Sequence, residues 1–554
     1  MLFDYKFYGN TAVSGSAGAV DMAFSPDVSR PPTFFRGVLG KSIAFREAIS
    51  ALHGVVISDL RFKPKDKTAY KEWAAQQEVA MLAEFGAAYQ TGLKEQIKTI
   101  REELQEIGKN REAIMSPYYT ARQKYFNYLY QKEREIWFVL DPVITVHPDE
   151  IFFECFSQDE STYGRLGSSY EVFKHIGEFA CGTTNIDYSA DLYQEFQKIR
   201  EYKETNFVVD PSGFQVQTTN EDVYNEVKID LPDSWVRGFL QVSSAMTLPA
   251  NSFDLHPMDV FNICQILRRK KEKIGPRSLR FILQPGQPVE LLFEPWDIRI
   301  KCRRSIYNGK SAEEIRLWGR RRLLILERLI PVMQKLTVHL LGNGMPSFFI
   351  ADLGHQSFTL GLSGWTSNDW SRAGNFDLMA PRLEVDLGTK EMIFKALREN
   401  WTEPSAQLAQ RLNLETRIVE GALSAYTQAG LVMYDLNKKT YRLRELSRDP
   451  LPLEALRFNN PRESQAQEFV QADRVTVQAQ SLPDGRLKLN GTVKDKNTLL
   501  QPSLVLDRDE RLVEANCTCW FHHQNKLRMG PCEHILALRI AHNRQNWWSR
   551  WLMN

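Results

Sequence analysis

Three cysteines and one histidine near the C-terminus are spaced as ligands of a single metal ion. Cys517 and Cys519 are separated by one residue, and Cys532 and His534 repeat that spacing after twelve intervening residues. Structural zinc sites use four sulfur or nitrogen ligands in a tetrahedron, which leaves no open position for a substrate. The spacing therefore predicts one structural Zn²⁺ ion held by these four residues, and no catalytic metal.

The elements around the two ligand pairs can bring them to one ion. Residues i and i+2 of an extended strand point to the same side, so the Cys-x-Cys pair can reach one ion together. Gly530 and Pro531 then predict a turn. The apolar spacing of HILALRIAH, which begins at His534, predicts a helix. The alternating runs RVTVQAQ and RLKLNGTV predict a β-hairpin before the site.

The same residues are compatible with two alternatives to this ligand set. His522 and His523 lie between the ligand pairs and are alternative fourth ligands, and the cysteines could instead be free thiols. However, three of the seven cysteines fall within 16 residues beside a histidine at matching spacing, which favours the metal. The remaining four cysteines are scattered, which predicts a reducing, cytoplasmic compartment rather than a disulfide scaffold.

The pattern CxC…CxH, placed after a β-hairpin and before a helix, resembles the SWIM-type zinc finger. The four predicted ligands fall on its four ligand positions, and the resemblance covers residues 471–554. SWIM modules occur in transposase-like, chromatin-remodelling and recombination-accessory proteins, which implies DNA or protein binding rather than catalysis. More loosely, RPPTFFRG, SDLRFKPKDKTAYKEW and FTLGLSGWTSNDWS resemble a group of bacterial SWIM proteins. These are encoded beside a MoxR-type AAA ATPase and a von Willebrand A-domain protein, which the resemblance implies as partners.

Residues 386–446 predict a winged helix, because three short amphipathic helices precede a two-stranded ribbon. The third helix offers Arg417 but also two glutamates, whereas helices that read bases usually present several Arg, Lys, Asn or Gln. The ribbon contributes Lys438 and Lys439, which indicate phosphate contact at most. The pattern therefore favours a protein-docking role over base recognition.

A second basic segment and two tryptophans are further candidates for nucleic-acid contact. The arginines at 320–322, together with Arg303 and Arg304, could follow a phosphate backbone, although a solvated face is the favoured alternative. Trp365 and Trp370 could stack on a base, but burial within a loop is favoured. The candidate nucleic-acid-binding residues are Arg417, Lys438, Lys439, Arg320, Arg321 and Arg322.

The predicted fold is a multidomain α+β protein with a β-rich, mixed body. A long helix-rich stretch without proline predicts an inserted helical hairpin. RFILQPGQPVELLF predicts a β-hairpin turned at Pro285 and Gly286, and IRIKCRRSIYNGKSAEEIRLW predicts another turned at Asn308 and Gly309. The predicted domains are an N-terminal α+β domain (1–230, with the helical hairpin at about 68–138), a central α+β domain with basic segments (231–385), a winged helix (386–446), a linker (447–470) and a ββα-like zinc-finger domain (471–554).

The sequence offers little support for an enzyme. The GKS at 40–42 imitates a P-loop, but Phe35 stands where its first glycine is needed, and neither HExxH nor GxSxG occurs. One weak alternative is a metal-dependent nuclease that uses Asp210, Glu226 and Lys228 to hold Mg²⁺ and activate water. Such triplets arise often by chance, so we predict no enzymatic activity.

Composition narrows the class of protein further. Seventy Lys and Arg residues against 68 Asp and Glu leave a net charge of +2, too balanced for a chain that coats nucleic acid. No run approaches 18 apolar residues, and MLFDYKFYGN does not resemble a signal peptide, so we expect neither a membrane span nor a secretory leader. The sequence thus predicts a cytoplasmic, zinc-binding adaptor that docks partner proteins. A DNA-binding accessory factor is the alternative, and a nuclease is the third.

Overall fold

The chain divides into two units, Met1–Asp59 with Leu140–Asn554, and Leu60–Val139. The second unit, and with it the predicted helical hairpin at about 68–138, lies outside the described residues. The computed structural model describes residues 12–15, 19–24, 33–59, 142–185, 196–197, 199–201, 204–209, 233–271, 277–364, 369–371, 375–380, 383, 385–446, 461–483, 486–496, 498–506 and 512–551.

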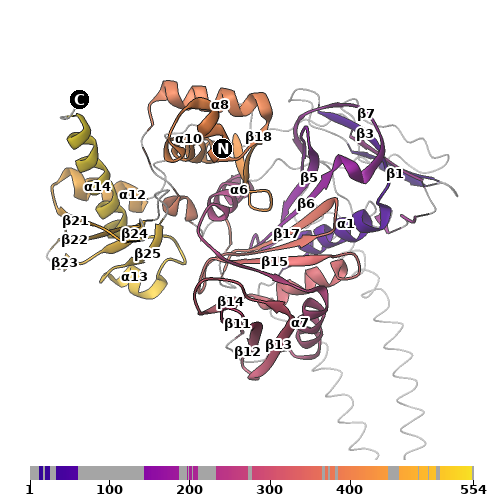
Figure 1. The fold of residues 1–554 in the computed structure, drawn as a ribbon, viewed down its shortest axis with the longest axis horizontal. Helices are drawn as coiled ribbons and strands as arrows, with labels where there is room; N and C mark the ends of the chain where they lie inside the picture. The colour runs from indigo at the N-terminus through magenta and orange to yellow at the C-terminus, as the bar shows by residue number, and fades with distance from the viewer. Residues whose placement is uncertain are drawn as a thin grey trace, which may run out of the picture. The chain divides into compact units, whose positions relative to one another are not determined.

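The largest element of the fold is an antiparallel sheet of eight strands (Figure 1). Its central strands are buried on both faces; β5, for example, buries all seven residues of EIFFECF. Helix α1 (Ser42–Val56) packs across β5, β6 and β17 and closes one face of the core. In spatial order the strands are β10 (Asn251–Leu255), β15 (Lys335–Leu340), β16 (Ser347–Asp352), β17 (Gln356–Leu362), β6 (Thr162–Ser169), β5 (Glu150–Phe156), β4 (Val143–Val146) and β8 (Gly182–Asn185).

This sheet combines strands from both sides of the boundary predicted at residue 230. Strand β17 pairs with β6 along its whole length, so the predicted N-terminal and central domains share one core. Helix α6 (Asp233–Met246) adds Trp235 and Phe239 to the aromatic contacts around Phe156 of β5. A five-stranded sheet extends the N-terminal part in the order β1 (Ala12–Gly15), β2 (Ala19–Phe24), β9 (Glu204–Val209), β3 (Phe34–Leu39) and β7 (Phe173–Ala180), and η1 (Tyr170–Val172) precedes β7.

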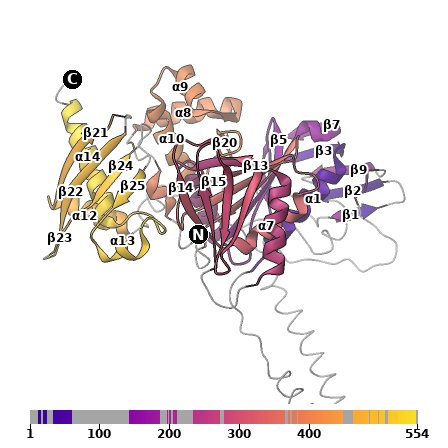
Figure 2. The same ribbon diagram turned by 60° about the horizontal axis from the view of Figure 1, so that its bottom comes forward.

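A four-stranded sheet corrects one of the predicted hairpins. Strands β11 and β12 pair around Gly286, whose positive φ of 74° suits a tight turn, as predicted. The hairpin predicted at Asn308 and Gly309 is wrong, because β14 pairs with β11 and β13 pairs with β12. The sheet order is therefore β13-β12-β11-β14, and the connection from β13 to β14 passes from one edge of the sheet to the other. The strands are β11 (Ser278–Leu283), β12 (Pro288–Phe293), β13 (Ile298–Ile306) and β14 (Glu313–Trp318), beside α7 (Pro257–Arg269) and η2 (Arg320–Leu329) (Figure 2).

Residues 387–443 form three helices and a small antiparallel sheet. The helices bury their apolar faces against one another around Ile393, Leu408 and Leu423. Asp386 caps the first helix by accepting a hydrogen bond from the backbone N–H of Thr389 at 2.9 Å. The elements are α8 (Leu387–Asn400), β18 (Thr402–Glu403), α9 (Ser405–Leu412), α10 (Thr416–Gln428), β19 (Val432–Asp435) and β20 (Thr440–Leu443), and the sheet order is β18-β20-β19.

The C-terminal part is a five-stranded sheet covered on one face by two helices. Residues 461–471 differ from the predicted linker, because they form α12, which buries Ala466 and Phe469 against the C-terminal helix. No helix among the described residues is long and apolar enough to cross a membrane. The elements are α12 (Pro461–Gln471), β21 (Val475–Ser481), β22 (Leu487–Asp495), β23 (Thr498–Leu500), β24 (Ser503–Leu506), β25 (Leu512–Asn516), α13 (Trp520–Asn525) and α14 (Glu533–Trp551), and η3 (Phe376–Met379) lies earlier in the chain.

Candidate metal centre

The four predicted metal ligands converge on one point in the C-terminal part. Their ligand atoms all lie within 4.8 Å of one another, and all four side chains are buried. Cys517 and Cys519 follow β25 in an extended segment, while Cys532 and His534 stand at the start of α14. A strand end and a helix start therefore place the two pairs face to face, and the Cys₃His group is suited to hold one metal ion.

The surroundings of His534 fit a bound cation. Both ring nitrogens of His534 are buried and have no hydrogen-bond partner among the described residues. A carboxylate oxygen of Asp495 lies 3.6 Å from Nε2, and one of Glu533 lies 3.5 Å from Nδ1. Metal-binding histidines commonly orient their second nitrogen toward a carboxylate, so either nitrogen can bind the ion while the other faces an acid. The ring of Phe469 stacks on the imidazole at 5.5 Å and holds its plane.

The side chains of the group shift the pKa values of Cys519, Cys532 and His534, and not all in the same direction. Burial disfavours a protonated His534, but the nearby thiols of Cys517 and Cys519 outweigh burial and raise the pKa of His534 to about 10. Hydrogen bonds from the thiols of Cys517 and Cys532 lower the pKa of Cys519 far below its usual value. The thiols of Cys517 and Cys519 raise the pKa of Cys532. A divalent cation bound here would require thiolates and a neutral histidine.

The alternative ligands His522 and His523 take no part in this convergence. His523 is exposed, and the group of converging ligand atoms does not include His522. His522 is buried instead, and its backbone N–H donates a hydrogen bond to Sγ of Cys519 at 3.3 Å. A donor aimed at the sulfur favours its thiolate form. His522 thus supports a ligand rather than replacing one.

The loop before Cys532 lies directly against residues 375–380. Gly530 has a φ of 78°, and a Cβ there would lie 2.7 Å from the carbonyl oxygen of Asn375. The side-chain amide of Asn375 donates to the carbonyl oxygen of Met529 at 3.4 Å. From α14, the Arg539 guanidinium donates to the carbonyl oxygens of Leu378 and Ala380 at 3.3 and 3.1 Å. The candidate metal loop is therefore part of a contact with a distant segment of the chain.

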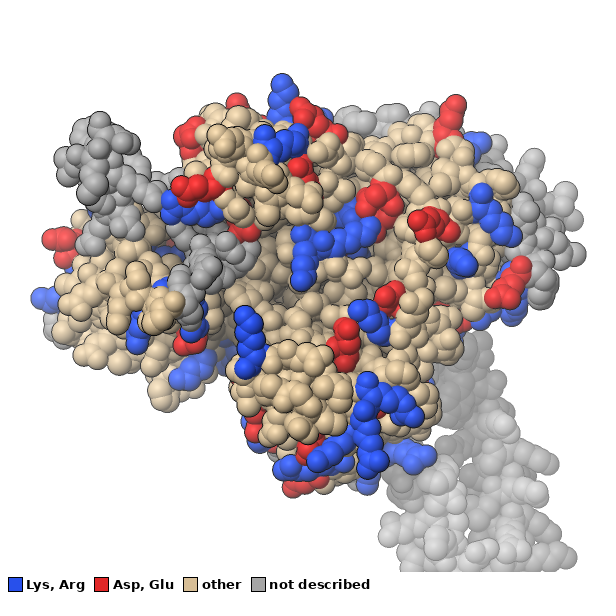
Figure 3. Space-filling view, viewed as in Figure 1, with Lys and Arg blue, Asp and Glu red and all other residues tan. Residues whose placement is uncertain are grey.

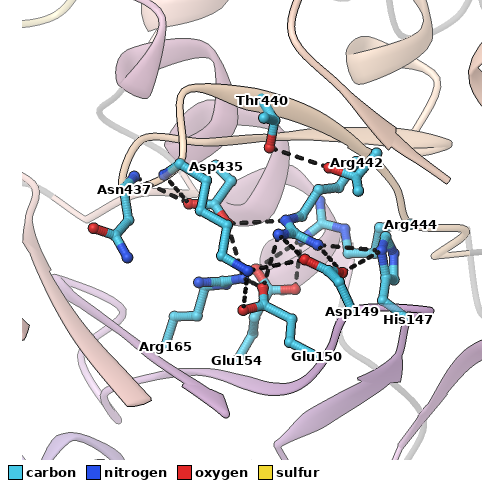
Figure 4. A network of polar contacts seen from close by, with 12 residues as sticks. His147, Asp149, Glu150, Glu154, Arg165, Asp435, Asn437, Thr440, Arg442 and Arg444 are labelled. Atoms are coloured by element: carbon cyan, nitrogen blue, oxygen red, sulfur yellow. Dashed lines mark hydrogen bonds and ion pairs between the residues drawn. The ribbon is translucent and has the colours of Figure 1, made fainter. Parts of the chain in front are cut away.

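A second polar cluster joins the β19–β20 hairpin to the eight-stranded sheet (Figure 4). Four carboxylates and four cations meet there, and Arg165, Asp435, Arg442 and Arg444 are buried. We call the cluster the hairpin network. It consists of Asp149, Glu150, Glu154, Asp435, Arg165, Lys438, Arg442 and Arg444.

Arg442 is the centre of the hairpin network. Two of its nitrogens donate to the two carboxylate oxygens of Asp149 at 2.8 and 2.9 Å, and Nε donates to Asp435 at 2.9 Å. Nη2 also lies 3.2 Å from Glu150. Two residues along the chain, Arg444 donates from one nitrogen to both oxygens of Glu154 at 3.0 Å. The contact of Arg442 with Asp149 uses two guanidinium nitrogens on two carboxylate oxygens, a geometry that lysine cannot provide because it offers only a point charge.

The charges of the hairpin network control the protonation of its members. Burial alone would raise the pKa of Asp149, but hydrogen bonds and charges from Arg442 and Lys438 outweigh burial and lower that pKa well below its usual value. The pKa of Asp435 is lowered likewise, because Arg165 and Arg442 outweigh its burial. Next to them, burial and the charge of Arg442 lower the pKa of His147 to about 4. At neutral pH the two aspartates are therefore charged and His147 is neutral.

The predicted contacts of the ribbon with phosphate are not supported. Lys438 lies 2.9 Å from Asp149 and 3.0 Å from Glu150, so its charge is balanced within the protein. Arg417 pairs with its neighbour Glu415. Lys439 is exposed at the tip of the hairpin. Helix α10, the predicted third helix, buries Val419 to Ser424, and it packs against α8, α9 and α6.

The arginines at 320–322 do not form the proposed phosphate patch either. Arg320 is buried, donates to the carbonyl oxygens of Ser278 and Glu294, and lies over the ring of Trp296 at 4.8 Å. Arg322 is also buried and donates to the carbonyl oxygen of Ser161 at 3.1 Å. Arg321 donates to carbonyl oxygens at the end of α7. On the face shown in Figure 3, Lys and Arg are interspersed with Asp and Glu over most of the surface, and a group of Lys and Arg gathers near the lower end.

The remaining candidates fall into two groups. Trp370 is fully buried and stacks on Phe348 at 5.9 Å, as the favoured interpretation predicts. Trp365 lies outside the described residues, as do Asp210, Glu226 and Lys228 of the nuclease alternative. Sequence reasoning did not find the hairpin network, because Arg442 and Arg444 lie almost 300 residues from Asp149 and Glu154. Among the described residues, only Asp435, seven residues before Arg442, is a nearby partner of these two arginines.

Comparisons with known proteins give little further guidance. No protein-family model and no curated protein matches the chain. Among solved structures, proliferating cellular nuclear antigen from Entamoeba histolytica matches at 7% identity with a TM-score of 0.31. That match covers 59% of this chain and 97% of that chain. A likeness at this level carries no argument about fold or function.

Proposed function

We propose that this protein is a non-enzymatic zinc-binding adaptor. The observation that carries the proposal is the closed Cys₃His group, in which four buried protein ligands converge within 4.8 Å. Four protein ligands complete the tetrahedron that Zn²⁺ adopts in structural sites, so no position remains for a substrate or an attacking water. A SWIM-type finger held together in this way would serve as a stable recognition unit in the cytoplasm.

The arrangement of residues 387–443 supports a docking role over a DNA-reading role. We interpret these three helices and their small sheet as a winged helix. Its ribbon cations Lys438, Arg442 and Arg444 are neutralised by carboxylates of the eight-stranded sheet. The middle of its third helix, from Val419 to Ser424, is buried. A winged helix whose cations are engaged within its own chain has little charge left for phosphates, and its free surface suits a protein partner.

The partners that the SWIM resemblance implies are a MoxR-type AAA ATPase and a von Willebrand A-domain protein. Each would be purified and mixed with the zinc-loaded full chain, and the mixture passed through a size-exclusion column with light-scattering detection. We expect co-elution at a defined stoichiometry, which persists at about 200 mM salt because the contact is not a phosphate-type interaction. Separate elution of all three proteins under these conditions would contradict the adaptor assignment.

One observation favours a second candidate, a DNA-binding accessory factor. Trp520, directly after the ligand Cys519, is 76% exposed, and Lys526 is exposed at the end of the same short helix. An exposed indole beside a cation suits stacking on an unpaired base. Fluorescence anisotropy with single-stranded DNA, duplex DNA and RNA at about 50 and 200 mM salt separates the two candidates, since nucleic-acid binding weakens steeply with salt. Submicromolar, salt-sensitive binding that Trp520→Ala removes would place this candidate first.

A further inference from the structure

The edge strands of the described sheets differ in how they are protected against pairing with another chain. Natural proteins commonly place charges, prolines or bulges on long edge strands, because unpaired N–H and C=O groups attract a further strand. Strand β13 carries Arg299, Lys301 and Arg303 and contains a register shift. Strand β14 carries glutamates and an arginine, and β7 carries Lys174 and Glu178. These long edges are protected.

Strand β21 lacks such protection. Its seven residues, VTVQAQS, include no charge and no proline. It lies at the edge of its sheet, and β22 is its only strand neighbour among the described residues. Of the edge strands longer than five residues in the described part of the chain, β21 alone has no charged residue. Its side chains from Gln478 to Ser481 are all exposed.

The register shows which backbone groups β21 presents outward. The N–H of Lys494 on β22 donates to the carbonyl oxygen of Arg474 at 3.0 Å, so even-numbered residues of β21 face β22. The N–H of Gly491, opposite Val477, instead donates to Pro502 at 3.2 Å on the other side. In an antiparallel pair these two kinds of position alternate. Val475, Val477 and Ala479 therefore direct their N–H and C=O groups away from the sheet.

The two faces of β21 indicate the chemistry of a complementary strand. Val475 and Val477 pack toward the core, on the face that α14 covers. On the opposite face, β21 and β22 present Thr, Gln and Asn together with the cations Arg474, Lys488 and Lys494, and no carboxylate. A strand added here would place alternate apolar side chains beside the valines and its acidic side chains on the cationic face.

We propose that an extended, acidic and alternately apolar segment of a partner protein adds to β21 as a further strand. The proposal rests on the adaptor function for the partner being a protein, and it names the docking site. Strand addition satisfies the outward N–H and C=O groups of Val475, Val477 and Ala479, while the side-chain alternation selects the segment. Helix α14, which carries His534, packs against β21 behind this edge.

The test uses the zinc-loaded full chain and two variants at one exposed position. Ala479→Pro removes an outward N–H, and proline is tolerated on edge strands, whereas Ala479→Thr keeps the N–H. The probe is a fluorescein-labelled nonapeptide in which Val alternates with Thr and Glu. We expect equal affinity for the natural chain and Ala479→Thr, and at least about tenfold weaker binding by Ala479→Pro, since one strand hydrogen bond and its neighbours are lost. Circular dichroism and zinc content confirm that both variants fold.

The outcomes separate the docking site from the adaptor function. No binding of the nonapeptide, or equal binding by both variants, would overturn the site. A dimer of the natural chain that Ala479→Pro abolishes would also overturn it, because a second copy would then occupy β21. If the partner proteins co-elute equally with both variants and the nonapeptide does not bind, the adaptor function stands without this site. If the nonapeptide binds but no partner co-elutes, the site stands and the adaptor function fails.

Discussion

The Cys₃His group and the hairpin network are both buried polar clusters, but they are completed in different ways. In the hairpin network, four carboxylates meet four cations, and Arg442 alone pairs with three of the acids. In the Cys₃His group, three thiols and one imidazole converge, and both nitrogens of His534 lack a hydrogen-bond partner among the described residues. The charges of the first cluster are paired within the protein, although Nε of Arg165 and Nε and Nη2 of Arg444 have no hydrogen-bond partner among the described residues. The second cluster is instead a set of four ligand atoms suited to hold one metal ion.

This difference shows when a buried polar cluster indicates a ligand. Buried charges are normally paired, and a buried ion pair is by itself weak grounds for function. The hairpin network obeys that rule, and its ion pairs join the β19–β20 hairpin to the eight-stranded sheet. Four metal-ligating atoms that converge within 4.8 Å of one another are the informative case. The following experiments change one cluster at a time and compare the size of the effect.

The largest effect is expected from loss of the metal. Structural zinc can supply on the order of 10 kcal/mol of folding free energy, so Cys532→Ser or a strong chelator should unfold the C-terminal part. Cys181→Ser, a change at a half-buried cysteine outside the group, is the matched control. Zinc content by atomic absorption and thermal unfolding by circular dichroism measure the result. A Cys532→Ser protein that keeps both one zinc equivalent and its unfolding transition would refute the metal assignment.

A smaller but still large effect is expected in the hairpin network. Arg442→Met leaves the buried carboxylates of Glu150 and Asp435 short of a partner, which should cost about 3–5 kcal/mol of unfolding free energy. Arg417→Met breaks the exposed pair with Glu415 and should cost about 1 kcal/mol or less. Urea denaturation at pH 7 measures both. Equal losses in the two variants would mean that the network contributes no more than a surface ion pair.

The smallest effect concerns pH. His147 has a folded-state pKa of about 4, whereas an unfolded histidine titrates near 6.5, so below pH 6.5 the unfolded chain binds the additional proton. Stability from this residue is therefore present above pH 6.5 and is lost as the pH falls toward 4. Between pH 7 and 5 the loss should be about 2 kcal/mol. His147→Gln should lose correspondingly less over that interval in urea denaturation, and an unchanged pH dependence would contradict a buried neutral histidine.

The sequence predicted the Cys₃His group because its geometry is local. Only twelve residues separate the two ligand pairs, and the short helix α13 and a loop are enough to bring the pairs together. The same holds for the hairpin around Gly286, whose strands are adjacent in the chain. Short-range spacing, turn residues and ligand chemistry together fix such features before any long-range contact forms.

The hairpin network was not predictable in this way. Arg442 and Arg444 lie in the ribbon whose cations Lys438 and Lys439 predicted phosphate contact, and two of their acidic partners are distant in the sequence. Those partners, Asp149 and Glu154, come from the N-terminal half of the eight-stranded sheet. The hairpin at Asn308 was wrongly predicted for the same reason. Strand β14 pairs with β11 instead of β13, and this pairing depends on contacts within the assembled sheet. One signal was available, namely that Arg442 and Arg444 flank the apolar Leu443 in a strand-like segment.

The close approach of Gly530 to Asn375 links metal binding to the contact between two segments of the chain. The two binding equilibria must influence each other equally. If contact between the loop and residues 375–380 increases the affinity for zinc by some factor, bound zinc increases the affinity of the loop for residues 375–380 by the same factor. The apparent dissociation constant for zinc would then report the state of a contact that contains no metal ligand. A side chain larger than hydrogen at position 530 would weaken both equilibria together, although all four ligands would still be present.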